Sequence, residues 1–315
     1  MVVDSLFEAI RSFFDQLTSI AWAPLGLAIL CHFGRIASRT RAWLNIVGAA
    51  YPDAHVRWRD VMGAYLAGIG ANAIIPGRGG DLLRLYIAKH RVEGATYPTL
   101  GATLLVETVF DTLLGSLLIG WALATGVLPG LGVLPNLPPI DWLWAFRNPD
   151  AAAGVLFLAL VVATVFAVFA AQRVTEFWQH VRQGLAILRD PRRYGRHVAA
   201  WQALDWSFRI AGIYFFLRAF GLPADVHNIF VVMVTQSLST LLPLTPGGIG
   251  TEQALLVYLF QGAAASSDVL SFSVGVKLVV IAVNVTLGTI ATFAMLRSLR
   301  WRKAATEDAA SAERA

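Results

Sequence analysis

Long apolar segments separated by short arginine-rich blocks are the feature that most restricts the fold of this chain. A helix that crosses a membrane needs about 20 mainly apolar residues. Segments of this length and character are 18–37, 99–125, 151–171, 199–220 and 271–296. Only 14% of the 315 residues are charged, whereas a soluble domain carries about 25%. We therefore predict an all-α integral membrane protein, built as a polytopic helical bundle.

The composition also excludes several other classes of protein. A net charge of +5 together with 57% apolar residues rules out a disordered chain. The isoelectric point of about 9.7 suggests nucleic-acid binding, but the hydropathy argues against a nucleic-acid partner. A single cysteine, Cys31, excludes an internal disulfide. The six histidines include no H-x-x-x-H pair, so we expect no metal site, no cofactor and no catalytic residues.

The arginine blocks predict the orientation, because loops on the cytoplasmic side carry an excess of Lys and Arg. Such blocks follow 18–37, 151–171 and 271–296, which places all three in the cytoplasm. The stretches 126–150 and 264–270 carry little or no positive charge and face outward. The first block contains Arg35, Arg39, Arg41, Arg57 and Arg59. We predict a multi-pass protein of the plasma membrane (bacterial inner membrane) whose C-terminus is cytoplasmic.

Proline and glycine interrupt two further apolar stretches. The stretch 60–91 contains Pro76-Gly77-Arg78-Gly79-Gly80-Asp81, and 228–263 contains Pro246-Gly247-Gly248-Ile249-Gly250-Thr251-Glu252. Proline removes a backbone donor and glycine adds backbone freedom, so each stretch is predicted to be a broken, re-entrant hairpin; a pair of full crossings is the alternative. The predicted orientation gives the two halves of the chain opposite topology, which is typical of inverted repeats in transporters.

The first break combines a sharp glycine turn with cationic side chains. Its glycines are Gly77, Gly79 and Gly80. Asp81 is placed to cap a helix over 82–91. The unpaired N–H groups at the start of such a helix suit an anion such as a lipid phosphate, and Arg78 and Arg84 add bidentate donors. In the alternative interpretation, both arginines only extend to the interface and Asp81 only caps the helix.

The second break has the same pattern without an arginine. Its turn residues are Pro246, Gly247, Gly248 and Gly250. Thr251 is placed as an N-cap, and Glu252 falls in the first turn, where the helix dipole favours an acid. A structural and a functional role for Glu252 are equally consistent with this position. Neither break matches a phosphate-binding loop, so nucleotide binding is not expected.

Ionisable residues inside the predicted spans are further candidates, because each costs about 2.5–3.5 kcal/mol to insert. Glu107 and Asp111 lie four residues apart on one helical face. They could share a proton, attract a cationic group or pair with basic residues elsewhere. Lys277 is a natural partner for either acid, as a structural ion pair or as a substrate contact. Asp205 and Arg209 form an i,i+4 pair that we expect to neutralise itself.

At the two breaks the sequence resembles the lysylphosphatidylglycerol synthase transmembrane region family, which comprises flippase-like membrane proteins. The residues that carry the resemblance are NAIIPGRGGDLLR, at 72–84, and LPLTPGGIGTE, at 242–252. The sequence departs from the family at two charged positions. Family members tend to have Glu-Arg where this chain has Glu107-Thr108, and an arginine where it has Lys277.

The resemblance covers roughly residues 18–300 and implies a domain that moves lipid between leaflets, without an attached aminoacyltransferase. We expect a single flippase-like transmembrane domain over 18–303 and a polar cytoplasmic tail over 304–315. Residues 1–17 have one apolar and one charged face, which predicts an amphipathic interfacial helix where family members often have another span.

The implied substrate is an anionic or aminoacylated phospholipid, a glycolipid or a hopanoid-type lipid, moved by a protein that is not an enzyme. The expected partners are membrane lipids with an anionic head group, and lipid-synthesis enzymes are further candidates. The oligomeric state stays open. Two other functions also stay open: a membrane-embedded lipid-modifying enzyme, and a non-catalytic membrane subunit of a lipid-synthesis pathway.

Overall fold

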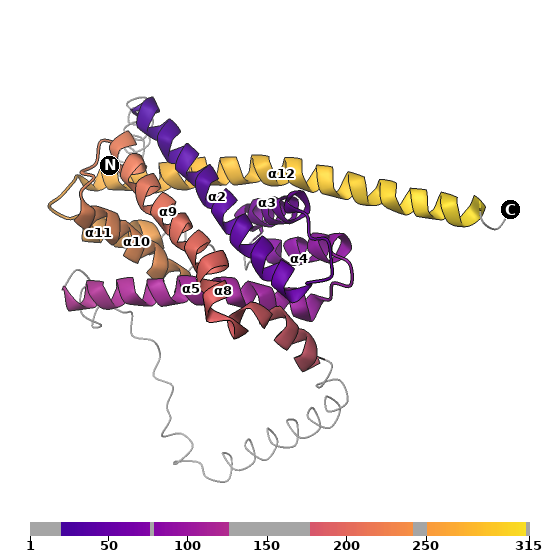
Figure 1. Ribbon diagram of the computed structural model, residues 1–315. Helices are drawn as coiled ribbons and strands as arrows, with labels where there is room; N and C mark the ends of the chain where they lie inside the picture. The colour runs from indigo at the N-terminus through magenta and orange to yellow at the C-terminus, as the bar shows by residue number, and fades with distance from the viewer. Residues whose placement is uncertain (1–19, 76–78, 126–176, 242–250, 313–315) are drawn as a thin grey trace, which may run out of the picture.

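The computed structural model describes residues 20–75, 79–125, 177–241 and 251–312, and within these ranges its regular structure is entirely helical (Figure 1). The helices are α2 (Trp22–Ala50), α3 (Trp58–Ile74), α4 (Gly79–Arg91), α5 (Tyr97–Ala124), η2 (Ala186–Arg189), α8 (Pro191–Tyr194), η3 (Gly195–Ala199), α9 (Ala200–Ala219), α10 (Val226–Leu241), α11 (Thr251–Leu259) and α12 (Ser266–Ala312). The predicted interfacial helix 1–17 and the predicted span 151–171 lie outside the described residues.

The long helices agree with the predicted spans, except that α2 extends further at its C-terminal end. Helices α5, α9 and α12 contain nearly all of 99–125, 199–220 and 271–296. Helix α2 begins close to the predicted start but continues to Ala50, well beyond the predicted end at residue 37. That prediction was wrong because it placed the first arginine block in a loop, whereas arginine is a good helix former. Helix α12 likewise continues through most of the predicted tail 304–315, to Ala312.

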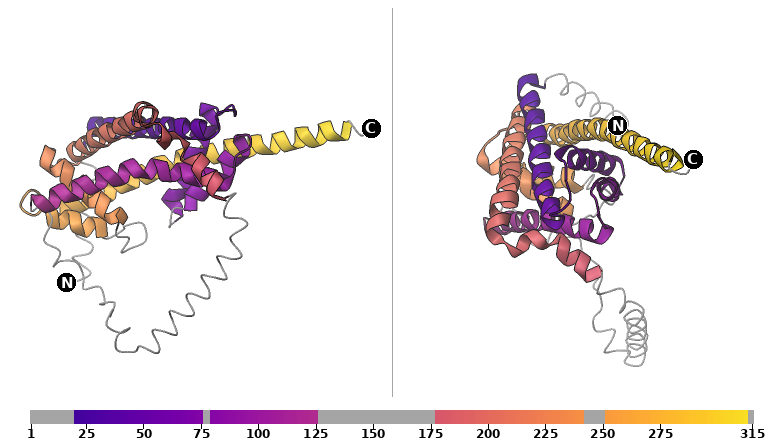
Figure 2. Two further views of the ribbon diagram at one scale, coloured as in Figure 1. Left: turned by 60° about the horizontal axis from the view of Figure 1, so that its bottom comes forward. Right: turned by 45° about the vertical axis from the view of Figure 1, so that its right-hand side comes forward.

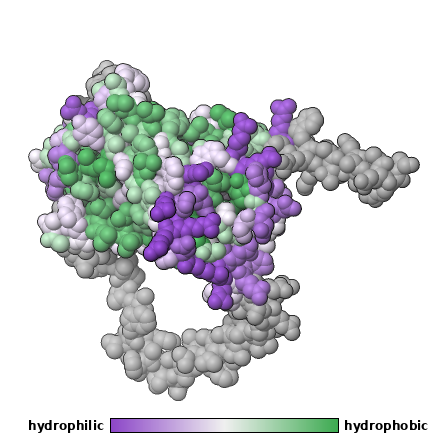
Figure 3. All heavy atoms as spheres, in the orientation of Figure 1, coloured by the Kyte–Doolittle hydropathy of each residue, from purple (hydrophilic) through white to green (hydrophobic). Residues whose placement is uncertain are grey.

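Helix α5 exposes an apolar stripe. Its members, with 51–61% of each side chain exposed, recur every fourth residue: Leu105, Val109, Leu113 and Leu117. Residues four apart share one helical face, so this face of α5 has no neighbour among the described residues and suits lipid. Apolar runs long enough to cross a membrane occur in α5 and α12, over Tyr97–Ala122 and Ser266–Arg297. Hydrophobic residues also cover much of the surface in Figure 3.

Helices α2 and α9 pack side by side in opposite directions. At one end the Ala21 N–H donates to the Ala219 carbonyl at 3.0 Å. At the other end the Asn45 side chain donates to the His197 carbonyl at 2.6 Å. Figure 2 shows this pair as one layer, with α5 and α12 running beneath it. The antiparallel pair joins the two halves of the chain.

The two largest hydrophobic cores lie toward opposite ends of this pair. One core joins buried residues of α2 to α3, α4 and α5, and includes Trp43, Val61, Ile87 and Leu100. The other joins α9 to α10, α11 and α12, and includes Leu217, Val232, Leu256 and Phe272. Each half of the chain therefore has a core made mainly of its own helices.

Helix α3 crosses α12 with their backbones in contact. A Cβ atom built on Gly70 would lie 2.5 Å from Gly288 Cα, and one built on Gly288 would lie 2.4 Å from Gly70 Cα. Only glycine fits at either position, because such distances lie inside van der Waals contact. The crossing fixes the first half of the chain against the last helix of the second half.

Candidate functional site

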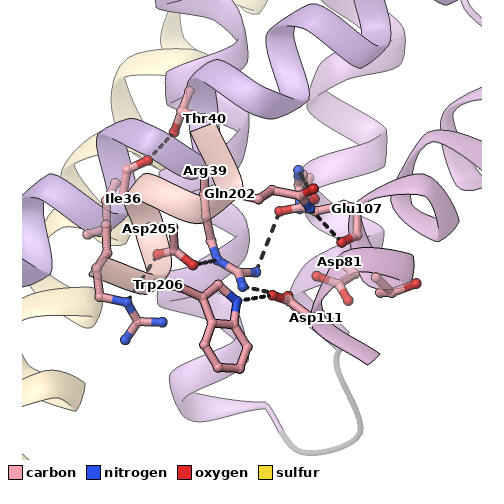
Figure 4. Close-up of polar contacts among 12 residues, drawn as sticks. Ile36, Arg39, Thr40, Asp81, Glu107, Asp111, Gln202, Asp205 and Trp206 are labelled. Atoms are coloured by element: carbon pink, nitrogen blue, oxygen red, sulfur yellow. Dashed lines mark hydrogen bonds and ion pairs between the residues drawn. The ribbon is translucent and has the colours of Figure 1, made fainter. Parts of the chain in front are cut away.

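The charges inside the helical bundle meet at Arg39 of α2, which reaches three acids on two other helices (Figure 4). Its Nε donates to Asp205 Oδ2 of α9 at 2.9 Å. Its Nη2 donates to Asp111 Oδ2 of α5, and its Nη1 lies 3.7 Å from Glu107 Oε1. The planar guanidinium fork suits this arrangement, because its donors point in several fixed directions. Arg39 therefore joins both halves of the chain.

Asp205 accepts from two arginines. Its side chain is 1% exposed, and the Arg35 Nε donates to Oδ1 at 3.1 Å. Arg35 and Arg39 lie four residues apart on one face of α2, which brings both guanidinium groups to the same carboxylate. The predicted self-neutralising pair of Asp205 with Arg209 is therefore wrong, since Arg209 donates instead to Gln236 Oε1 at 2.9 Å.

Glu107 accepts from a second buried arginine. Arg84 of α4 donates from Nη2 to Glu107 Oε2 at 2.7 Å, and only 8% and 6% of the two side chains are exposed. The guanidinium carbon of Arg84 lies 3.7 Å from the ring centroid of Trp43 and 4.7 Å from that of Tyr65. Aromatic faces attract a cation, so these rings hold Arg84 in place.

Neutral donors complete the surroundings of the two α5 acids. The Trp206 indole N–H donates to Asp111 Oδ1 at 3.0 Å. The Gln202 side chain donates to the Glu107 backbone carbonyl at 2.8 Å and accepts, at 3.5 Å, from the Tyr194 hydroxyl. Burial raises the pKa of that hydroxyl, which keeps it protonated. Glu107 and Asp111 do share a face, and each pairs with basic residues elsewhere, which was one of the predicted alternatives.

We call Arg35, Arg39, Arg84, Glu107, Asp111 and Asp205 the charge network. Its three cations and three anions cancel in formal charge. Arg209 adds a positive charge beside the network, with its guanidinium carbon 5.0 Å from the Trp206 ring centroid. The Nε groups of Arg84 and Arg209 are buried and have no hydrogen-bond partner within the part of the chain that the structure describes. Buried N–H donors without a partner are costly, so both suit an incoming anionic oxygen.

The first predicted break lies beside this network, but its local geometry differs from the prediction. Helix α4 begins at Gly79, not at residue 82, so Asp81 lies in the first turn and accepts from the Asn72 side chain at 3.0 Å. The Gly80 N–H donates to Asn72 Oδ1 at 2.7 Å. This amide is therefore not available to an anion. A Cβ on Gly80 would lie 2.1 Å from the Gly68 carbonyl oxygen, so this glycine permits close packing of α4 on α3.

The second predicted group forms a separate ion pair. Glu252 lies in the first turn of α11, as predicted, and accepts from Lys277 Nζ of α12 at 3.2 Å. The predicted pairing of Lys277 with Glu107 or Asp111 is wrong, because those acids bind arginines. The candidate residues that lie outside the described ranges are Arg78, Pro246, Gly247, Gly248 and Gly250.

Arg35, Arg39 and Asp205 belong to the site but are not predicted as members of it. Both arginines lie in the block that is predicted to be a cytoplasmic loop, and Asp205 is predicted to pair locally with Arg209. A usable signal was present, because an i,i+4 pair of arginines continues the apolar segment 18–37 without a helix-breaking residue. Among the described residues, no group of three or more His, Cys, Asp or Glu side chains is arranged to hold a metal ion.

The chain shares sequence similarity with known proteins. The glycosyltransferase AglD of Haloferax volcanii is 26% identical to this chain over an alignment of 258 positions, which covers 67% of this chain and 41% of the relative. The chain thus matches less than half the length of that protein. No solved structure matches the chain. Residues 5–288 match the family described as the lysylphosphatidylglycerol synthase TM region, which is nearly the whole chain. The protein is therefore a membrane protein that belongs to the lysylphosphatidylglycerol synthase transmembrane region family.

Proposed function

We propose that this protein moves a lipid with an anionic or aminoacylated head group between membrane leaflets, without changing the lipid chemically. The observation that carries the proposal is the charge network together with the neighbouring Arg209, because the Nε groups of Arg84 and Arg209 are buried without a hydrogen-bond partner in the described part of the chain. A phosphate oxygen accepts hydrogen bonds from guanidinium groups in bidentate geometry. Arg209 supplies the extra positive charge that an anionic head group needs. Phospholipids, glycolipids and hopanoid-type lipids remain within the substrate class.

The depth of the network supports this function. Arg39 lies about 16 Å from the end of α2, and Glu107 lies about 15 Å from the start of α5, at 1.5 Å per helical residue. Half of a hydrocarbon core of about 30 Å is also about 15 Å. Ionisable groups in the middle of a membrane mark substrate or ion pathways in membrane proteins. A head group crossing the bilayer would meet these side chains halfway.

The packing of the helices supports an inverted repeat. Helices α2 to α5 would correspond to α9 to α12, in order. In agreement, α3 packs on α12 while α10 packs on α5, and α4 packs on α5 while α11 packs on α12. An in-plane two-fold axis would also make α2 and α9 antiparallel neighbours, as they are. Substrate sites lie at the repeat interface in transporters of this kind.

The lengths of the paired helices support re-entrant hairpins. Helices α3 and α4 contain 17 and 13 residues, and α10 and α11 contain 16 and 9. Within the described residues, all four are shorter than the roughly 20 residues of a full crossing. We place the protein in the plasma membrane of a bacterium, with a cytoplasmic C-terminus, on the distribution of its arginines.

A membrane-embedded enzyme acting on a lipid-linked substrate is the second candidate. It is favoured by the name glycosyltransferase that the Haloferax volcanii relative carries. Product formation by the purified protein alone would rank this candidate first. Copurification of a stoichiometric partner, with no transport by the protein alone, would instead favour a non-catalytic subunit of a lipid-synthesis pathway.

Reconstituted vesicles test the translocase directly. The measured quantity is the initial rate at which a fluorescent lipid becomes accessible from the outer leaflet, with phosphatidylglycerol, its lysyl derivative and uncharged diacylglycerol as probes. We expect the protein to raise the rates of the first two lipids above those in protein-free vesicles. The rate of diacylglycerol, whose small uncharged head group crosses a bilayer unaided, should not change. Arg84→Gln should slow the first two lipids. The matched control is Arg192→Gln, which removes an exposed arginine of α8 far along the chain from the network. Equal transport rates for Arg84→Gln and wild type would show that the charge network does not take part in lipid transport.

A further inference from the structure

Two adjoining hollows that the charge network does not use lie along α2, one bordered by α8 and η3 and the other by α9. The first, the basic pocket, has a volume of about 440 Å³, and its ionisable lining residues are Arg41, His55, Arg193 and His197. The second, the apolar groove, has a volume of about 500 Å³ and is lined by Ser38, Trp58, Trp201, Leu204 and Phe208. Arg41 lines both hollows and therefore joins them.

The basic pocket favours a negatively charged ligand. No acidic residue is among the residues that line it. The nearby Asp190 carboxylate is occupied, because it accepts from the backbone N–H groups of Arg192 and Arg193. Within the described ranges, the guanidinium groups of Arg41 and Arg193 have neither an ion-pair nor a hydrogen-bond partner. Figure 3 shows hydrophilic residues gathered around α8, next to a hydrophobic surface.

The order of the two hollows along the helices matches the order of parts in a lipid. Along α2, the groove residues, Gly34 to Arg41, lie nearer the middle of the helix, whereas the pocket residues, Arg41 to Gly48, lie nearer its C-terminal end, with Tyr51 just beyond it. From Ser38 to Tyr51 the chain rises about 20 Å, close to the thickness of one leaflet with its head groups. An apolar half therefore lies deep in the membrane, and a cationic half lies at its surface.

Two further observations in the groove point to an amphipathic ligand. The Ser38 side chain is 1% exposed, and its hydroxyl has no hydrogen-bond partner in the part of the chain described. A polar atom of a bound ligand would satisfy this donor. Trp58 and Trp201 line the same groove next to Arg41, and tryptophan prefers the boundary between hydrocarbon and head groups.

We propose that the basic pocket and the apolar groove together bind one anionic phospholipid of the leaflet that the arginines predict to be cytoplasmic. The phosphate lies between Arg41 and Arg193, and one acyl chain lies against Leu204 and Phe208. The site is separate from the charge network, because the two sets of residues occupy different faces of α2 and of α9. Binding here does not depend on lipid translocation.

The test measures how much phosphatidylglycerol the purified full-length protein retains, by native mass spectrometry after titration with phosphatidylglycerol or zwitterionic phosphatidylcholine. We expect Arg41→Gln/Arg193→Gln to weaken retention of phosphatidylglycerol about 30-fold, at about a factor of five for each arginine near a membrane surface. The matched control Arg57→Gln/Arg192→Gln removes two exposed arginines of neighbouring segments that do not line either hollow. It should retain the lipid like wild type.

Two further arms distinguish a lipid site from a site for a free anion. Leu204→Asn should also weaken retention, because it places a polar group in the apolar groove. If Leu204→Asn retains the lipid fully, or if inorganic phosphate displaces it at equal concentration, the pocket binds a free anion and the lipid proposal is wrong. Equal loss in both double variants would likewise overturn it, since general surface charge would then account for retention. The assay measures retention and not flipping, so failure here leaves the translocase proposal untouched.

Discussion

The contact between Arg39 and Asp205 yields the sharpest prediction, because it connects the two halves of the chain through a carboxylate that is 1% exposed. Two unit charges about 4 Å apart interact by about 4 kcal/mol at an effective dielectric constant of 20. Removing one partner of a buried ion pair costs about 3–5 kcal/mol, because the other charge is left uncompensated. Arg35 stays on Asp205, so we expect Arg39→Gln to cost about 3 kcal/mol.

A double-mutant cycle isolates this contact. Asp205→Asn should also cost about 3 kcal/mol, because it leaves Arg35 and Arg39 without their shared acid. The double variant should cost about 4 kcal/mol rather than 6, which corresponds to a coupling energy of about 2 kcal/mol. The free energy of unfolding in lipid bicelles is the measured quantity. Arg57→Gln, an exposed arginine at the start of α3, serves as the control and should leave stability unchanged.

Two results would refute this reasoning. A coupling energy below about 0.5 kcal/mol, the lower limit seen for residues in contact, would mean that the two side chains do not interact in the membrane. A loss for Arg39→Gln no larger than for Arg57→Gln would mean that the charge network contributes nothing to the packing of α2 on α9.

Three other predictions concern one close glycine contact, one ion pair and one buried arginine. Gly80→Ala should destabilise the protein by about 3 kcal/mol in thermal unfolding, because its Cβ would lie 2.1 Å from a backbone oxygen of α3. Gly101→Ala, whose Cβ would meet nothing within 4 Å, should be neutral or slightly stabilising. Glu252→Gln should cost about 1 kcal/mol and add to the loss from Arg39→Gln, because the pair with Lys277 is a separate contact; a non-additive result would contradict that separation. Arg209→Gln should slow vesicle transport of anionic lipid at least tenfold with little loss of stability, since its neutral partner is Gln236; an unchanged rate would exclude it from the pathway.

The helices could be predicted from the sequence because their apolar segments are long and their breaks are rich in proline and glycine. The positions of α5, α9 and α12 agree with the predicted spans for this reason. The extension of α2 could not be predicted in the same way. Hydropathy ends a span at the first arginines, whereas pairing with Asp205 lets Arg35 and Arg39 continue the helix inside the bundle.

The members of the site were partly predictable, but their partners were not. Arg84, Glu107 and Asp111 could be predicted as candidates, because an ionisable group inside an apolar segment is costly to insert in a membrane and therefore marks a functional site. Helical periodicity then shows which face such a residue occupies, but not which helix packs against that face. Lys277 had the right charge for Glu107, yet the acid is satisfied by Arg84 across only 23 residues of sequence. The packing of α4 against α5 determines that Arg84, and not Lys277, pairs with Glu107.

The glycine crossing of α3 and α12 determines which helices can slide past one another. A shift of one helical turn, about 5.4 Å, would place Asn284 or Thr292 opposite Gly70. Neither side chain fits where even a single carbon atom lies 2.5 Å from the neighbouring backbone. The two helices are therefore held in one register. In the proposed transport cycle, a change of shape would occur elsewhere, where side chains rather than backbones form the contact and can exchange partners.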